Sequence, residues 1–217
     1  MKVIIAAGGP EKELPDMNAF DEGDVYWIGV DRGTVYLLNR GITPQAAFGD
    51  FDSVSKEEWN YIQQEVKSIH TFPAEKDETD LELALQWSLS LHPKQLTVLG
   101  ATGGRLDHFF GTVSLLANKK VVSGDLEVEV VDRLNRLSVC HGPVRRKVWQ
   151  DPAYKYFSFF PVTKEVKGLT LEGFKYPLAD HTVQLGSTLY VSNELEGESG
   201  TFSFTDGILM VIRSSDD

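Results

Sequence analysis

Short apolar runs alternate with stretches of helix length over the first 130 or so residues, and this alternation most constrains the fold. Each run is about as long as a buried parallel strand. Strands are expected at residues 2–7, 25–30, 45–48, 68–72, 95–99 and 126–131, and helices at about 55–66, from 79 onward and at about 105–119. Alternating strands and helices predict an α/β unit in which helices flank a mainly parallel sheet.

The pattern changes at Leu134, after which apolar and polar residues alternate with a period of two and no convincing helix of ten residues occurs. Strands are expected at residues 155–160, 168–172, 187–192, 201–204 and 208–212. Several short strands separated by turn residues are typical of a β-sandwich. We therefore expect two domains, an α/β domain at 1–133 and an all-β sandwich domain at 134–217.

The charge balance argues against polyanionic partners. Lys and Arg total 21 against 32 Asp and Glu, a net charge of -11, so long-range electrostatics would repel nucleic acid and anionic membranes. If the ligand is ATP, the same acidity predicts a divalent cation between carboxylates and triphosphate. The single cysteine, Cys140, excludes an internal disulfide. No apolar stretch approaches the roughly 18 residues of a spanning helix, and we expect a cytoplasmic protein.

The first polar cluster, GDFDS at 49–53, directly follows an expected strand. In extended backbone, side chains two residues apart point the same way, so Asp50 and Asp52 would converge on one metal ion. Carboxylates at this edge of an open α/β sheet also lie where such folds bind ligands. The alternative is an Asp-rich turn before a helix cap, which this cluster alone does not exclude.

The second cluster, KDETD at 76–80, lies at the junction between a strand and a helix. A helix N-terminus presents free N–H groups and a partial positive charge, which suit a phosphate or a carboxylate. The alternative is that Asp77 or Thr79 caps the helix and Asp80 occupies its first turn. A cap does not exclude a binding site.

The third cluster, GATGGRLDH at 100–108, again joins a strand to a helix. Glycines permit a tight turn and close approach of backbone N–H groups to phosphate, and Arg105 can bind phosphate oxygens with two parallel hydrogen bonds. The segment lacks the lysine of a P-loop. Asp107 would hold a metal or pair with Arg105. For His108, a helix-cap or packing role is favoured over that of a catalytic base.

Together, the three acidic junctions would open on the same edge of one parallel sheet. Four carboxylates at that edge would repel one another without a metal ion. The residues therefore predict a magnesium–nucleotide site for phosphoryl transfer. No nucleophilic triad competes with this interpretation, and Cys140 and His141 are expected to be structural.

In this order and combination, GDFDS, KDETD and GGRLDH resemble the signature of the thiamine pyrophosphokinase family, and YVSNE at 190–194 resembles its substrate-side motif. The resemblance covers nearly the whole chain. It implies an N-terminal α/β catalytic domain, a thiamine-binding β-sandwich that also dimerises, and a homodimer with active sites at the subunit interface. It also implies Mg²⁺ as cofactor and a reaction in which ATP and thiamine give AMP and thiamine diphosphate.

The resemblance also assigns residues to roles. The catalytic and metal-binding group would be Asp50, Asp52, Asp80 and Asp107. ATP would be bound by Asp31, Gly33, Lys76, Asp77, Thr79, Thr102, Gly103, Gly104, Arg105 and His108. Thiamine would contact Ser192 and Asn193. The sequence departs from the family pattern at Arg32, which replaces a glycine of the DGG segment, and at Gly111-Thr112, where many members carry Asn.

Two other functions stay open at this point. One is diphosphate transfer to another hydroxyalkyl heterocycle such as a pterin, because the phosphate-handling residues would serve either acceptor. The other is a non-catalytic thiamine or nucleotide sensor on the same fold. The complete carboxylate set argues against a sensor, which has no need of four metal-directed acids.

Overall fold

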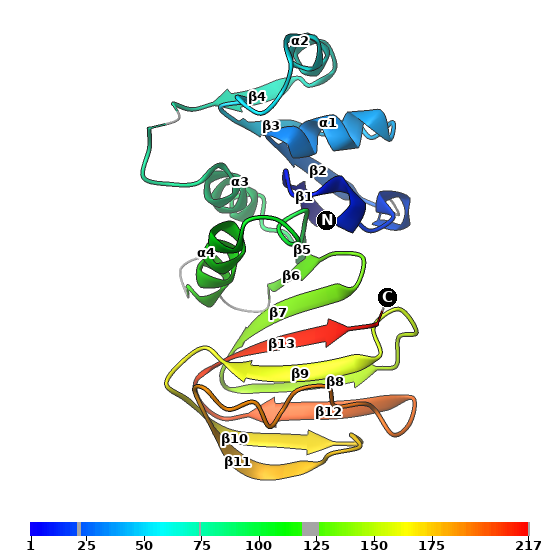
Figure 1. The fold of residues 1–217 in the computed structure, drawn as a ribbon, viewed down its shortest axis with the longest axis vertical. Coiled ribbons are helices and arrows are strands. Elements are labelled where there is room, and N and C mark those ends of the chain that lie inside the picture. Colours follow the sequence, from blue (N-terminus) through cyan, green and yellow to red (C-terminus); the bar gives the residue numbers. More distant parts are fainter. Residues whose placement is uncertain (21–22, 74, 119–125, 217) are drawn as a thin grey trace. The chain divides into compact units, whose positions relative to one another are not determined.

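The computed structural model describes residues 1–20, 23–73, 75–118 and 126–216 of the 217-residue chain. The chain forms two compact units, Met1–Arg133 and Leu134–Asp217 (Figure 1). In the described parts of the chain, no helix combines the length and apolar character that a membrane crossing requires.

The described part of the first unit contains a parallel sheet with the strand order β4-β3-β2-β1-β5-β6. Its strands are β1 (Lys2–Ala6), β2 (Val25–Val30), β3 (Ala46–Gly49), β4 (Ser68–Thr71), β5 (Gln95–Leu99) and β6 (Glu127–Val131). These bounds agree with the predicted strands to within one residue at each end. The strand order reverses between β1 and β5, and open α/β sheets bind ligands outside the carboxyl ends of the strands at such a switch point.

Helices cover both faces of this sheet (Figure 1). They are α1 (Arg32–Asn39), α2 (Lys56–Glu65), α3 (Asp80–Leu89) and α4 (Leu106–Ala117), with short 3-10 turns at Glu11–Glu13 and Met17–Phe20. Neighbouring residues of β3 point to opposite faces: Ala47 packs in the cluster formed with α1 and α2, whereas the ring of Phe48 lies 5.4 Å from that of Trp87 on α3. The helix α1 was not predicted, and residue 119, the expected end of α4, lies outside the described residues.

The second unit is all β, as predicted. Its strands are β7 (Asn135–His141), β8 (Val144–Trp149), β9 (Tyr156–Pro161), β10 (Glu165–Glu172), β11 (Leu178–Gln184), β12 (Ser199–Phe204) and β13 (Ile208–Ser214). Strands β7, β13 and β9 form one antiparallel layer, and β11, β10, β12 and β8 form another.

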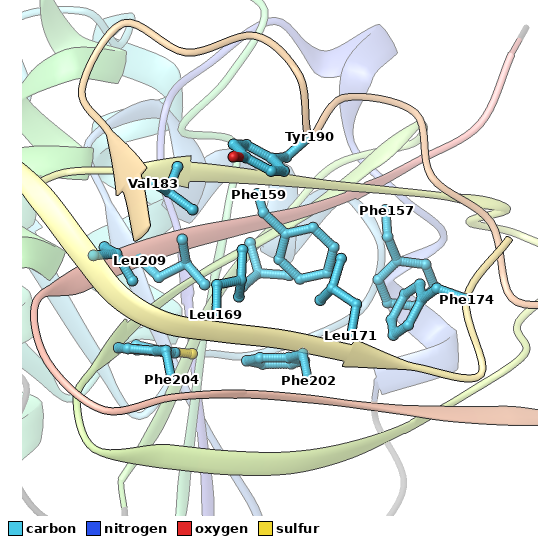
Figure 2. Packing of buried hydrophobic residues seen from close by; sticks show 13 residues of the cluster. Phe157, Phe159, Leu169, Leu171, Phe174, Val183, Tyr190, Phe202, Phe204 and Leu209 are labelled. Atoms are coloured by element: carbon cyan, nitrogen blue, oxygen red, sulfur yellow. The ribbon is translucent and has the colours of Figure 1, made fainter. Parts of the chain in front are cut away.

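The core of the second unit is built from aromatic side chains of both layers (Figure 2). Phe159 on β9 packs edge to face against Phe174 and against Phe202 on β12, with ring centroids 5.7 Å apart in each pair. Leu169 and Leu209 lie beside this cluster and are fully buried. Such edge-to-face pairs and interdigitating inner faces are typical of a two-layer β core.

The strand predicted at residues 187–192 is wrong. These residues form turns, and Ser192 has a φ of 57°, which no regular strand permits. Isolated backbone hydrogen bonds attach the segment to β9: Phe159 N–H donates to Tyr190 O at 2.9 Å. Strands β7, β8 and β11 were not predicted.

Candidate active site

Four strand ends of the first unit carry the polar segments of the predicted site. Strand β2 leads into Asp31, β3 into Asp50, β4 into the segment that ends at Asp80, and β5 into the glycine loop that begins at Gly100. Because these strands are parallel, their carboxyl ends lie at one edge of the sheet. The expected convergence of the acidic junctions at one edge therefore follows from the observed topology.

Asp31 lies against the loop that carries Asp50 and Asp52. Its backbone has a φ of 47°, a conformation that is uncommon for a residue other than glycine. Gly49 makes room for the carboxylate, because a Cβ at Gly49 would overlap the Asp31 side chain. Asp31 Oδ1 accepts a hydrogen bond from Phe51 N–H at 3.3 Å.

The carboxyl group of Asp31 is harder to ionise than an ordinary aspartate. Burial raises its pKa from 3.8 to about 6, and the negative charges of Asp80, Asp50 and Asp52 contribute to the increase. This coupling places Asp80, Asp50 and Asp52 within electrostatic reach of Asp31. Asp31 was predicted as an ATP-binding residue only, and the structure adds it to the acidic group.

A pH-dependent stability follows from the raised pKa of Asp31. Between 3.8 and about 6 the folded protein retains a proton that the unfolded chain has lost, so this carboxyl group lowers stability as the pH rises through that interval and adds no penalty below it. In EDTA, the unfolding midpoint of Asp31→Asn should exceed that of the wild type by an amount that grows over this interval and then levels off. A difference that does not depend on pH would contradict the assignment.

In the loop after β3, the directions of the Asp50 and Asp52 side chains are not set by the alternation of an extended strand. Phe51 has a φ of 56°, so the backbone reverses there and the expectation of an extended Asp50–Asp52 segment is wrong. Asp52 N–H donates to Asp50 Oδ1 at 3.1 Å in a local turn. The Phe51 side chain is buried against Trp59, with ring centroids 4.7 Å apart, which anchors the loop in the core.

Lys76 and Asp80 form an ion pair at the start of α3, with Nζ 2.9 Å from Oδ1 and both side chains largely buried. The contact lacks hydrogen-bond geometry, so Asp80 Oδ1 is a buried oxygen with no hydrogen-bond partner among the described residues. Thr79 caps the helix by accepting from Glu82 N–H at 3.1 Å, while Asp77 is exposed. The capping alternative therefore holds for Thr79, and Asp80 lies in the first turn of α3 as the ion-pair partner of Lys76.

The glycine loop after β5 packs against the end of β1. Gly9 N–H donates to Gly100 O at 2.8 Å, and a Cβ at Gly9 would lie 2.4 Å from that oxygen, so only glycine fits there. Thr102 Oγ1 donates to the buried carboxylate of Asp132 at 2.6 Å. Gly103 has a φ of 73° and is exposed, as is Gly104.

Arg105 and Asp107 lie together on the surface at the start of α4. The guanidinium donates two hydrogen bonds to the carboxylate, at 3.1 and 2.6 Å, and holds the pKa of Asp107 below its usual range. Both side chains are more than half exposed, and His108 is exposed beside them. The structure thus places Asp107 in a pair with Arg105, and a metal-binding role for Asp107 stays a prediction.

Gly33 fills a structural position. A Cβ at this residue would lie 2.0 Å from Ala6 O, so glycine lets the first turn of α1 approach β1. Its predicted contact with ATP stays a prediction.

The residues predicted to contact thiamine differ in exposure. Ser192 is exposed, and its N–H donates to Ser158 Oγ at 3.0 Å. Asn193 is buried, and its amide oxygen accepts from Tyr176 N–H and Glu194 N–H at 3.0 and 2.9 Å while Nδ2 donates to Tyr176 O at 2.9 Å. The amide of Asn193 therefore braces the turn, and a direct contact with thiamine stays a prediction.

A hollow of about 250 Å³ lies on the second unit at this turn. It is lined by Leu171, Tyr176, Leu178, His181, Leu189, Tyr190, Val191 and Asn193. A larger hollow of about 320 Å³ lies beside Tyr154, Glu194 and Arg213 and contains none of the predicted site residues. Both hollows reach the substrate-side motif, the smaller one through Tyr190, Val191 and Asn193 and the larger one through Glu194, but only the smaller is lined by a predicted thiamine-binding residue, Asn193.

The acidic edge fits a divalent cation whose coordination is completed by water and substrate phosphates. In the described residues, no three His, Cys, Asp or Glu side chains are arranged to hold a metal ion by themselves. Mg²⁺ is usually bound by one or two carboxylates, water and substrate phosphates rather than by a full protein cage. The negative charges of Asp80, Asp50 and Asp52 near Asp31 are consistent with such a site.

Sequence reasoning missed three residues that support this edge. Asp132 holds Thr102, and Arg32 forms an ion pair with Glu58 at 3.3 Å. The spacing of Ser55 and Glu58 is a visible capping-box signal, but the contact with Arg32, 26 residues away, has no signal in the sequence.

Comparisons with known proteins agree with this geometry. Residues 19–128 match the family model of the thiamin pyrophosphokinase catalytic domain, and residues 146–209 match that of the thiamin pyrophosphokinase vitamin B1 binding domain. The chain is 45% identical over its full length, and over 100% of the relative, to thiamine pyrophosphokinase of Bacillus subtilis. Two crystal structures are also similar. That of thiamine pyrophosphokinase from Bacillus subtilis has a TM-score of 0.93 at 43% identity with both chains covered completely. That of thiamin pyrophosphokinase from Geobacillus thermodenitrificans has a TM-score of 0.91 at 48% identity, covering 100% of this chain and 99% of that one.

Proposed function

The chain belongs to the thiamine pyrophosphokinase family, and from this premise we propose that it transfers the terminal diphosphate of ATP to the hydroxyl group of thiamine. The observation that carries the proposal is the full-length match to a thiamine pyrophosphokinase, together with four polar strand ends at one edge of a parallel sheet. The acceptor oxygen bonds to the β-phosphorus while the bond from that phosphorus to the α,β-bridging oxygen breaks. AMP leaves and the hydroxyl proton is released.

The acidic group is proposed to bind ATP through Mg²⁺. Asp50, Asp52 and Asp80 would hold the ion, with Asp31 beside them and Asp107 contributing from the start of α4. The ion would offset the charge of the triphosphate and of the leaving AMP. The repulsion of the Asp31 carboxylate by Asp80, Asp50 and Asp52 supports this arrangement.

Cations and helix N-termini are proposed to hold the triphosphate. Lys76 precedes α3, and its Nζ lies 2.9 Å from Asp80 Oδ1. It can therefore bind phosphate oxygens that lie near the acidic group. Arg105 presents its two-pronged guanidinium at the start of α4, a geometry that matches a phosphate. Free N–H groups at both helix starts would add to the attraction, and the exposed Gly103 and Gly104 leave room for close approach of the ligand.

The acceptor is proposed to bind on the second unit, in the hollow beside Ser192 and Asn193. Aromatic Tyr176 and His181 are among the residues that line this hollow, and aromatic rings suit a flat cationic heterocycle. The exposed hydroxyl of Ser192 can pair with an aminopyrimidine. The active site would be completed across a homodimer, with the acceptor held by the partner chain, and the cytoplasmic location stays an expectation from the sequence.

Product identification tests the function directly. With ATP, Mg²⁺ and thiamine, phosphorus NMR should show AMP and thiamine diphosphate appearing together, with no thiamine monophosphate, because attack at the β-phosphorus transfers both phosphoryl groups in one step. A hydroxymethylpterin in place of thiamine should give no diphosphate ester. Stoichiometric ADP would reject the assignment, and turnover of the pterin alone would favour the other acceptor class.

A further inference from the structure

Arg32 joins two segments of the acidic edge that are distant in sequence. It is the first residue of α1, directly after Asp31. Its Nη1 donates to Ser53 O at 2.9 Å, and its two terminal nitrogens lie 3.4 and 3.3 Å from the two carboxylate oxygens of Glu58. One guanidinium thus holds both a backbone carbonyl of the Asp50–Asp52 loop and the first turn of α2.

Glu58 has a second task at the same place. Its Oε2 accepts from Ser55 N–H at 2.7 Å, while Ser55 Oγ accepts from Glu58 N–H at 3.1 Å, which completes a capping box. The loop that carries Asp50 and Asp52 ends at this cap. The ion pair therefore couples the end of that loop to the residue next to Asp31.

The other side of the loop is held independently. Phe51 is buried, and its N–H donates to Asp31 Oδ1. Two attachments then fix a short loop whose central residue has a positive φ, a conformation that persists only when the surroundings hold it. Loss of the Arg32 attachment would therefore loosen the end of the loop that follows Asp52, while the Phe51 attachment stays in place.

We propose that Arg32 and Glu58 are positioning residues for the reaction, which keep the Asp50–Asp52 loop in its observed conformation beside Asp31. The inference rests on the proposed function for its effect on turnover. Its structural part, the attachment of the loop, does not depend on that function. Arg32 stands where the family pattern has a glycine, so this attachment depends on a side chain that a glycine would not supply.

A direct contact between Arg32 and the triphosphate is the competing role. Its side chain is 40% exposed, but both terminal nitrogens already bond to protein oxygens. The Glu58 carboxylate also neutralises much of its attraction for an anion. These contacts favour positioning over phosphate binding.

The test compares Arg32→Gln, Arg32→Lys, Glu58→Gln and the Arg32→Gln/Glu58→Gln double variant. Glutamine at 58 can still complete the capping box, so this change removes the ion pair and spares the cap. We expect kcat to fall by on the order of 30-fold for Arg32→Gln and about tenfold for Glu58→Gln, because small misplacements of reacting groups are costly. The double variant should be no worse than Arg32→Gln, since both changes break one network, and KM for ATP should change by less than about twofold.

Lysine at position 32 separates the two roles. It retains the charge but lacks the planar fork that reaches Ser53 and Glu58 together, so the positioning role predicts a kcat close to that of Arg32→Gln. A phosphate contact would instead be largely retained by lysine. A rise in KM for ATP of tenfold or more in Arg32→Gln with unchanged kcat, rescued by lysine, would overturn the proposal.

Backbone hydrogen exchange gives a readout that needs no activity. In substrate-free protein, peptides covering residues 50–58 should exchange roughly tenfold faster in Arg32→Gln than in the wild type. The matched control is Arg40→Gln at the other end of α1, where Arg40 bonds Glu11 at 3.0 Å, and it should leave both this exchange and kcat unchanged. Unchanged exchange in Arg32→Gln, or an equal change in Arg40→Gln, would overturn the proposal. Faster exchange without any thiamine pyrophosphokinase activity in the wild type would overturn the proposed function alone.

Discussion

Replacing Asp80 by asparagine is expected to lower kcat by on the order of a hundredfold or more while the fold persists. The change keeps the volume of the side chain but removes the negative charge at this edge, including the charge of the oxygen that lies 2.9 Å from Lys76 Nζ. Charge placed at a phosphoryl-transfer site stabilises the transition state through the metal ion, and its loss typically costs this much. Steady-state rates at saturating Mg²⁺ would measure the effect, and circular dichroism would check the fold.

The matched control for this change is Glu82→Gln. Glu82 lies in the same first turn of α3 and accepts a hydrogen bond from Gln86 at 3.1 Å, so the control has the same effect on the helix dipole without touching the acidic group. It should retain near-wild-type turnover. Loss of folding in Asp80→Asn would support a purely structural role for that residue.

The same change at the other acids tests whether they act together. Asp50→Asn, Asp52→Asn and Asp107→Asn are each expected to lower kcat by about a hundredfold or more. Asp107 is the most informative of the three, because it is exposed and paired with Arg105. If two of the four variants kept near-wild-type turnover at saturating Mg²⁺, the shared-metal hypothesis would be wrong.

Mixing two inactive variants is expected to restore roughly a quarter of wild-type activity. One chain carries Asp80→Asn in the first unit, and the other carries Val191→Arg, which fills the hollow of the second unit at a side chain that is 43% exposed. If each site combines the first unit of one chain with the second unit of its partner, a heterodimer has one intact site and one with both lesions. Random pairing makes about half of the dimers mixed, and half of their sites work.

Two controls define the outcome of the mixing experiment. A mixture of Asp80→Asn and Asp50→Asn chains places both lesions in first units, so it should recover nothing. Leu185→Arg introduces the same charge at an exposed apolar residue outside the hollow, and it should remain active alone. No recovery in a mixture shown to contain heterodimers would mean that both residues serve a site within one chain.

Local sequence determined the elements whose patterns are local. The strands from β1 to β6 were predicted as short segments beside turn or capping residues; most are apolar and buried, whereas β4 is partly exposed. The start of α2 was predicted because Ser55 and Glu58 satisfy helix N–H groups within four residues of chain. The parallel order followed from the alternation of strands with helices.

The missed elements are those whose pattern depends on tertiary burial. In α1, every residue from Gly33 to Leu38 is buried, and its first turn contains Gly33, Thr34 and Val35, which are weak helix formers, so tertiary burial rather than local propensity stabilises this short helix. The reverse error occurred at 187–192, where apolar side chains such as the 82% exposed Leu189 belong to a turn beside a hollow. Period-two alternation cannot distinguish a strand from such a turn.

The sequence alone determined which junctions carry the acids, because short motifs at strand ends have a fixed place in an α/β sheet. The tertiary structure decided how these side chains are held. In the folded chain, Asp31 is coupled to the other acids and Phe51 is buried in the core. The amide of Asn193 hydrogen-bonds the backbone of a turn, and Arg32 forms an ion pair with Glu58. The physical reason is that a side chain's partner is chosen by proximity in space, and the contacts that decide its charge and orientation join residues that the sequence keeps far apart.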